Sequence, residues 1–279
     1  MMRFWVFIGF FLLSVSAAEE PLLKVQLSAY HPLATKEHLL KRLLPEQYHT
    51  QFIKDKKWHK DQLDEFSVDL AQESYSLYLP QPFDPQNTYG LIIWIHPDES
   101  GKPNRGWMKV FDDLKLIYIS ANRSGNQHSV TARRAPLALH ALHNLQQQYQ
   151  IDPDRIYLAG FSGGGFTSSH LAMGYGDLIS GAYYMSGADP VGGQRVPMPS
   201  ENRLEKIKKQ GRYVFYAGKK EPKFMRAVSR AYRSYEELGI ENIHFLKNSK
   251  AGHDYVNASW MRKGLELLDQ GLPEKSTEN

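Results

Sequence analysis

Short apolar runs alternate with amphipathic stretches from Val68 to the C-terminus, and this alternation limits most strongly what the chain can fold into. The runs have the length of strands, and the stretches between them have helical spacing. We expect strands at about 75–79, 91–95, 116–119, 155–159, 181–185, 213–217 and 242–246. Strands that alternate with helices need crossover connections. The sequence therefore predicts one doubly wound α/β domain over residues 67–279, with a mostly parallel sheet and helices on both faces.

The first part of the chain does not share this alternation. Leu39, Leu40, Leu43 and Leu44 form an apolar helical face that ends at Pro45, and a polar stretch follows to Phe66. We interpret residues 19–66 as an N-terminal helical extension that packs on the sheet. In the main domain we expect helices over 135–148, 163–173, 223–238 and 256–268.

Residues 1–18 have the pattern of a secretory signal peptide. Arg3 precedes a short apolar run, and small residues lead to a predicted cleavage site after Ala18. The apolar run is much shorter than the roughly 20 residues that a membrane-spanning helix needs. The prediction is therefore a secreted or periplasmic protein without a membrane anchor.

Composition excludes several kinds of chemistry. The formal net charge is +4 and the chain has no Lys/Arg-rich block, so we expect no nucleic-acid partner. Cysteine is absent, which excludes disulfides, thiolate metal ligands and a cysteine nucleophile. His140 and His143 lie three residues apart on a predicted helix, but no third metal ligand is evident, so no metal site is predicted.

The segment Gly160-Phe161-Ser162-Gly163-Gly164 joins a predicted strand directly to a predicted helix. A serine on such a sharp turn has its hydroxyl raised above the edge of the sheet, and the glycines allow the strand and helix to approach. The alternative is a glycine-rich turn or a phosphate loop, but no Gly-Lys-Ser/Thr follows. We predict that Ser162 is a catalytic nucleophile.

A serine hydroxyl needs a base that accepts its proton. Of the histidines late in the chain, His244 lies inside a predicted strand, where a structural role is expected. His253 lies in the loop before the last helix, in the position that the base occupies in strand–serine–helix hydrolases. We therefore predict His253 as the general base.

The third member of such a triad is a carboxylate that orients the imidazole. Glu221 is the only acid in the loop after the strand 213–217. The chain order Ser162, Glu221, His253 matches the nucleophile–acid–base order of strand–serine–helix hydrolases. Asp189, after the strand 181–185, is the alternative. Asp254 is disfavoured because adjacent side chains rarely point at one another.

Acyl transfer also needs donors for the developing oxyanion. We predict the backbone N–H of Gly163 as one donor, and we expect the other in the loop after the strand 91–95. Arg123 and Asn126 follow the strand 116–119 and should lie at the same edge of the sheet, where they either contact substrate or cap the loop.

Three segments, 77–80, 91–96 and 151–164, together resemble secreted esterases of the α/β-hydrolase superfamily. The branch that they resemble holds polyhydroxybutyrate depolymerase-like and feruloyl or acetyl-xylan esterase-like enzymes, and the resemblance covers about residues 75–268. It implies the α/β-hydrolase fold and esterase chemistry without a metal or an organic cofactor. This chain departs from the usual His-Gly at His96-Pro97. Proline has no N–H, so the second oxyanion donor is expected at Asp98.

Two functions of different classes follow. The first is an exported serine hydrolase that cleaves a small-molecule or polymeric carboxylic ester, with a serine peptidase as the alternative enzyme. The second is a catalytically silent, hydrolase-like binding protein that keeps the fold. Ser162 and His253 favour the enzyme, whereas Pro97 and the open choice between Glu221 and Asp189 favour the silent protein.

Overall fold

The computed structural model describes residues 22–45, 68–193 and 195–272. The predicted signal peptide and most of the polar part of the predicted extension lie outside these residues. None of the helices in the described ranges has both the length and the apolar character needed to cross a bilayer.

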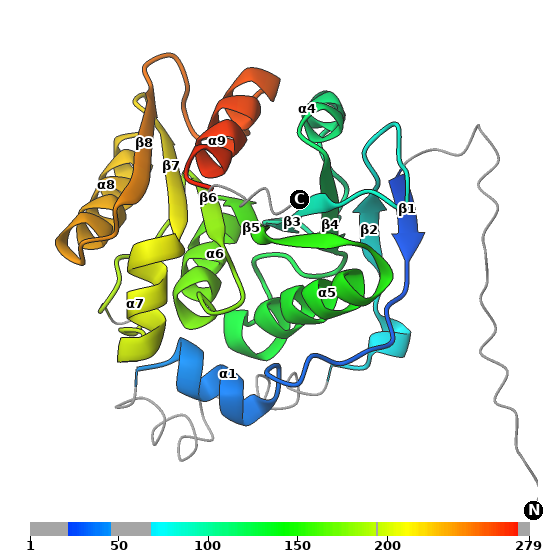
Figure 1. The fold of residues 1–279 in the computed structure, drawn as a ribbon. Helices are drawn as coiled ribbons and strands as arrows, with labels where there is room; N and C mark the ends of the chain where they lie inside the picture. The colour runs from blue at the N-terminus through cyan, green and yellow to red at the C-terminus, as the bar shows by residue number, and fades with distance from the viewer. Residues whose placement is uncertain (1–21, 46–67, 194, 273–279) are drawn as a thin grey trace, which may run out of the picture.

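One eight-stranded sheet forms the centre of the molecule, and it confirms the predicted doubly wound architecture (Figure 1). The strand order is β1-β2-β4-β3-β5-β6-β7-β8. The pairs β1–β2 and β2–β4 are antiparallel, and the pairs from β4–β3 to β7–β8 are parallel. The strands are β1 (Leu22–Val25), β2 (Tyr75–Tyr78), β3 (Tyr89–Ile95), β4 (Leu116–Ala121), β5 (Ile151–Phe161), β6 (Gly181–Met185), β7 (Arg212–Gly218) and β8 (Asn242–Asn248).

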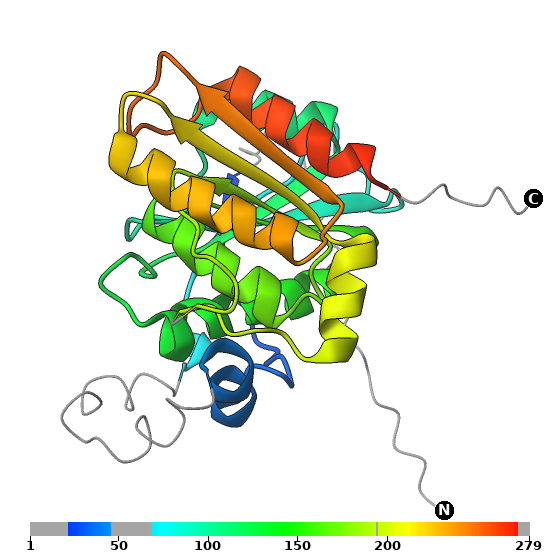
Figure 2. The ribbon, with the colours of Figure 1, turned by 90° about the vertical axis from the view of Figure 1, so that its left-hand side faces the viewer.

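Helices cover both faces of the sheet (Figures 1 and 2). One face packs against α4 and α9, and the other packs against α5, α6 and α8. Each face has its own apolar core, because strands such as β3, β6 and β7 are buried along their whole length. The helices are α1 (Lys36–Leu43), α4 (Met108–Asp113), α5 (Ala135–Gln148), α6 (Gly163–Gly174), α7 (Glu201–Gln210), α8 (Pro222–Glu237) and α9 (Ala258–Gln270).

The N-terminal region differs in part from the predicted helical extension. The apolar face at Leu39, Leu40 and Leu43 does form a helix, α1, which begins after the capping residue Thr35 and packs against α6. Residues 22–25, however, are not helical. They pair with β2 as the edge strand of the sheet, so this part of the predicted extension belongs to the main domain.

The strand order reverses direction at the carboxyl ends of β3 and β5. The chain leaves β3 through α4 toward β4, whereas it leaves β5 through α6 toward β6, on the opposite side. In open parallel sheets, ligands bind where adjacent strands are connected in opposite directions. The loop after β3 and the residue after β5, Ser162, meet at this position.

Candidate active site

Ser162 occupies a strained turn between β5 and α6. Its backbone angles are φ 53° and ψ −120°, in a region that residues other than glycine rarely adopt. The turn is held by a hydrogen bond from the Ser162 N–H to the carbonyl of Met185, at 2.8 Å. Strain of this kind lifts the serine side chain out of the helix and toward the edge of the sheet.

Glycine at position 164 lets α6 approach the sheet closely. A methyl group on Gly164 would lie 1.9 Å from the carbonyl oxygen of Ile95, at the end of β3. At Gly160, a methyl group would lie 2.4 Å from the carbonyl carbon of Gly164. Both contacts are with backbone atoms, so no side chain can move aside to relieve them. The spacing of glycines around Ser162 is therefore a requirement of this turn.

His253 meets Ser162 from the loop between β8 and α9. Its Nε2 atom lies 2.9 Å from Ser162 Oγ, within hydrogen-bond distance. The imidazole stacks on Phe224, with ring centroids 3.6 Å apart, and also packs against Phe161, at 4.7 Å. Burial lowers the pKa of His253 below its ordinary value of 6.5, and the carboxylates of Glu221 and Asp254 oppose this shift. A neutral imidazole can accept the serine proton.

The second ring nitrogen of His253, Nδ1, has no partner among the residues that the structure describes. A neutral imidazole that accepts from Ser162 at Nε2 carries its proton on Nδ1. This Nδ1 atom is buried and forms no hydrogen bond within the described ranges. A buried unpaired donor costs about 1–3 kcal/mol, so the site favours an approaching carboxylate.

Neither predicted acid is hydrogen-bonded to His253. Glu221 is the residue before α8, and its carboxylate has no hydrogen bond with the described part of the chain. It is nevertheless the carboxylate with the largest opposing effect on the pKa of His253. The alternative, Asp189, instead pairs with His170 at 3.0 Å, and both side chains are mostly buried. Of the two acids, Glu221 is the one available to His253.

The expected second oxyanion donor is not free. Gly163 begins α6, and its N–H has no acceptor in the described part of the chain. The N–H of Asp98, by contrast, donates to Nδ1 of His96 at 3.0 Å, and the Asp98 carboxylate accepts from the Tyr255 hydroxyl at 3.1 Å. In this structure the Asp98 N–H is therefore engaged, and its role as the second donor stays a prediction. The His96 ring reaches the backbone two residues ahead and takes the N–H that acyl transfer would need.

A buried arginine joins three segments of the site. Arg134, directly before α5, is 3% exposed, and its guanidinium donates to the carbonyls of His96, Ser124 and Gly163 at 3.0, 3.1 and 3.3 Å. Burial lowers its pKa to about 10, so it remains charged at neutral pH. Arg134 was not predicted from the sequence as part of the site. The available signal was a charged residue at the start of an otherwise apolar helix.

No set of three His, Cys, Asp or Glu side chains within the described ranges could hold a metal ion. His140, which was considered with His143 as a metal ligand, instead accepts a hydrogen bond: its Nδ1 atom lies 3.0 Å from the backbone nitrogen of His31. This bond helps to fix the N-terminal segment on α5.

No protein-family model matches the chain, and no curated protein is detectably similar to it. Solved structures do share its fold. A ferulic acid esterase matches with a TM-score of 0.58 at 16% identity, over 71% of this chain and 92% of that protein. A thermostable esterase matches with a TM-score of 0.54 at 18% identity, over 72% of this chain and 60% of that one. Dipeptidyl peptidase 4 of Porphyromonas gingivalis matches with a TM-score of 0.54 at 15% identity, over 72% of this chain and 34% of the peptidase.

These neighbours and the strand order define the class of fold: the chain has the α/β-hydrolase fold. The neighbours include both esterases and peptidases, and the chain spans only part of the thermostable esterase and of the peptidase. At these identities the likeness establishes the fold alone. The particular reaction has to be argued from the site.

Proposed function

We propose that the protein is an exported serine hydrolase that cleaves carboxylic esters through an acyl-enzyme intermediate. The observation that carries this proposal is the 2.9 Å contact between Ser162 Oγ and His253 Nε2, on a strained turn at the carboxyl end of β5. A nucleophile next to a neutral base is the arrangement that acyl transfer needs.

The proposed reaction has two halves. His253 accepts the Ser162 proton while Oγ attacks the ester carbonyl, and the carbonyl oxygen becomes an oxyanion near the Gly163 N–H. The intermediate collapses, the bond to the alcohol oxygen breaks, and His253 returns the proton to the leaving alcohol. Water then attacks the acyl-serine with His253 as base, which releases the acid and restores Ser162. Glu221 is the acid proposed to stabilise the imidazolium.

The test is covalent labelling together with turnover. The purified protein should react with a fluorophosphonate probe and hydrolyse p-nitrophenyl esters of short acids, and Ser162→Ala should lose both activities. Ser259→Ala, which changes an exposed serine at the start of α9, is the matched control and should keep both. Labelling that persists in Ser162→Ala would move the nucleophile elsewhere.

A silent binding protein is the second candidate, and specific observations favour it. Nδ1 of His253 has no partner within the described ranges, and the Asp98 N–H is engaged by His96. A wild-type protein that neither reacts with the probe nor turns over any ester would support this function. A third outcome, faster cleavage of aminoacyl p-nitroanilides than of esters, would favour a serine peptidase.

Export is proposed from the sequence of residues 1–18 alone. Expression of the full chain with its own N-terminus should give a secreted or periplasmic protein whose first residue is Glu19. Retention of residues 1–18 in the mature protein would contradict the predicted signal peptide.

A further inference from the structure

The loop after β3 leaves the proposed reaction short of one oxyanion donor. Pro97 has no N–H, and the Asp98 N–H is used by His96. Gly163 supplies one donor, but an oxyanion site is built from two or more convergent groups. The second donor has to come from another segment that reaches Gly163.

The side chain of Asn126 reaches that position. A methyl group on Gly163 would lie 1.9 Å from Oδ1 and 2.8 Å from Nδ2 of Asn126, and all three of its nearest neighbours are atoms of this amide. Glycine after the nucleophile therefore leaves room for the Asn126 amide. Because the two ends of an amide are assigned from their hydrogen bonds, either end of the Asn126 amide can face Gly163.

The Asn126 amide is free to bind an oxyanion. The side chain is exposed and forms no hydrogen bond within residues 22–45, 68–193 and 195–272. The backbone around it, in contrast, is well held. The Asn126 N–H donates to the carbonyl of Pro97 at 2.8 Å, and the Arg123 N–H donates to the carbonyl of Glu99 at 2.7 Å.

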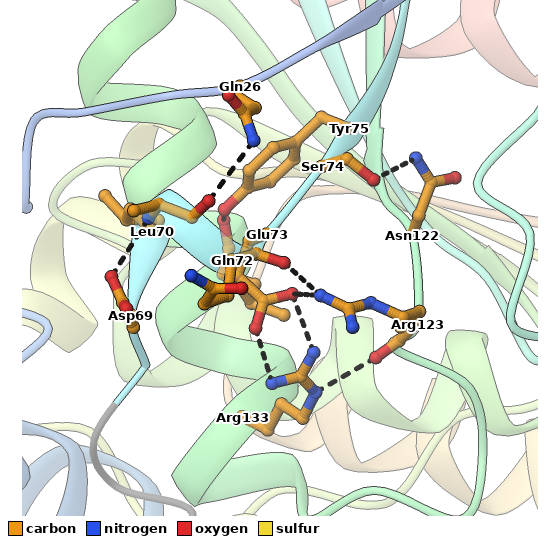
Figure 3. A network of polar contacts seen from close by, with 12 residues as sticks. Gln26, Asp69, Leu70, Gln72, Glu73, Ser74, Tyr75, Asn122, Arg123 and Arg133 are labelled. Atoms are coloured by element: carbon orange, nitrogen blue, oxygen red, sulfur yellow. Dashed lines mark hydrogen bonds and ion pairs between the residues drawn. The ribbon is translucent and has the colours of Figure 1, made fainter.

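A buried ion pair fixes the base of the same loop, as Figure 3 shows. Glu73 is 5% exposed and accepts two hydrogen bonds from Arg133, both at 2.8 Å. Arg133 Nε donates in turn to the carbonyl of Arg123, at 2.9 Å, and the Arg123 side chain also contacts Glu73 (Figure 3). A bidentate, mostly buried pair of this kind holds backbone far better than an exposed one.

Arg134 connects this loop to the nucleophile directly. Its guanidinium donates both to the carbonyl of Ser124, two residues before Asn126, and to the carbonyl of Gly163. The backbone that carries Asn126 is therefore held beside Gly163 by contacts on both sides. A donor that is fixed in advance is the kind that contributes most to transition-state stabilisation.

We propose that the Asn126 side-chain amide is the second oxyanion donor, in the place that the loop after β3 leaves unfilled. The proposal rests on the serine hydrolase function proposed above. The negative charge formed on the carbonyl oxygen is then shared between the Gly163 N–H and the Asn126 Nδ2–H.

The test uses the full-length mature protein with p-nitrophenyl acetate as substrate. Asn126→Ala and the isosteric Asn126→Asp should lower kcat by about 10²- to 10³-fold while KM changes little, because the contact forms only in the transition state. Binding of a trifluoromethyl ketone, which forms a tetrahedral adduct with the serine, should weaken in parallel. Asn202→Asp makes the same chemical change on the exposed first turn of α7 and should have no effect.

A double-mutant cycle separates catalysis from folding. Gly163→Ala alone should displace the Asn126 amide and lower kcat, whereas the same change in an Asn126→Ala background should cost little more, because the clashing side chain is gone. This cycle also covers the case in which Asn126→Asp folds poorly.

The outcomes distinguish the two proposals. A wild-type protein without Ser162-dependent turnover would overturn the hydrolase function itself. An active wild type whose Asn126 variants keep kcat within about threefold, less than 1 kcal/mol of barrier, would overturn only the role of Asn126. Equal costs of Gly163→Ala in both backgrounds would overturn it as well.

Discussion

The turn around Ser162 and the loop after β3 lie side by side at the edge of the sheet, but different kinds of contact hold them. The turn is fixed by backbone approaches, such as that of Gly164 to the carbonyl of Ile95. The loop from His96 to Gly101 also has backbone hydrogen bonds to residues 123 and 126, but side chains such as the His96 ring and the Asp98 carboxylate take part in holding it. A close backbone approach allows only glycine at a position, whereas a side chain can change its rotamer and its hydrogen-bond partner.

The same contrast exists between the two nitrogens of His253. The contact of Nε2 with Ser162 is already formed, since both residues are held by the ends of strands and by ring stacking. The contact of Nδ1 with an acid is not formed, although Glu221 lies at the start of α8 and its charge acts on the pKa of His253. The contact between the base and the nucleophile is therefore formed, whereas the contact between the base and an acid is not.

The largest effect on catalysis is expected at Glu221, the acid proposed to act on His253. Glu221→Gln should lower kcat by about 10³-fold or more, since loss of the acid costs on the order of 10⁴ in a well-studied triad. Asp189→Asn is the matched control. It should leave kcat nearly unchanged and lower thermal stability, because Asp189 pairs with His170. Steady-state kinetics on both variants measures the difference, and a crippled Asp189→Asn enzyme with an intact Glu221→Gln enzyme would reverse the assignment.

The backbone contacts of the turn come next. Gly164→Ala should destabilise the protein by about 3 kcal/mol or more, because the added methyl group overlaps the Ile95 carbonyl and the helix must move away from the sheet. Gly252→Ala, beside His253, is the control. Its nearest neighbour would be a carboxylate oxygen of Asp254 at 3.4 Å, so we expect a change within about 0.5 kcal/mol. Urea unfolding of both variants gives the two free energies, and equal values would contradict the argument.

The features that could be predicted from the sequence are those that depend on neighbouring residues. The elements of the sheet from β2 to β8 and the role suggested for Ser162 depend on local patterns: apolar runs, helical spacing and the glycines of one short turn. The strand β1 was missed because four residues at an edge, with Lys24 among them, have too little apolar character. The helix α7 was missed because Ile207 is its only fully buried residue.

The remaining parts of the site depend on contacts between distant segments. The bond from the Asp98 N–H to the His96 ring was not foreseen, because residue spacing does not determine a side-chain rotamer. Arg134 could not be assigned, since its three acceptors belong to residues 96, 124 and 163. Asn126 was noticed in the sequence only as one of two polar residues at the right edge of the sheet.

A smaller effect is expected in the pH profile. His253 acts as base only when it is neutral, so kcat/KM should rise with pH through the pKa of His253 and be level at pH 7. Burial keeps this pKa below 6.5, whereas the Glu221 carboxylate raises it. Glu221→Gln should therefore move the midpoint of the acid limb to lower pH, and Asp254→Asn should move it less. A midpoint that rises in Glu221→Gln would show that this carboxylate does not act on His253.

The smallest effect is expected at Pro97. If Asn126 is the second donor, an added N–H in the loop after β3 has no oxyanion to bind, because the Asp98 N–H remains on His96. Pro97→Gly should then change kcat by less than about threefold, under 1 kcal/mol of barrier, although the more flexible loop should lower stability slightly. Pro85→Gly, in an exposed segment far from Ser162 in the sequence, controls for the general cost of losing a proline. The same substitution in an Asn126→Ala background makes the measurement sharper, since any donor that the loop can supply would then restore activity. A rise of kcat by about tenfold in either background would mean that the loop can replace Asn126, and that the proline, more than the His96 contact, keeps it from doing so.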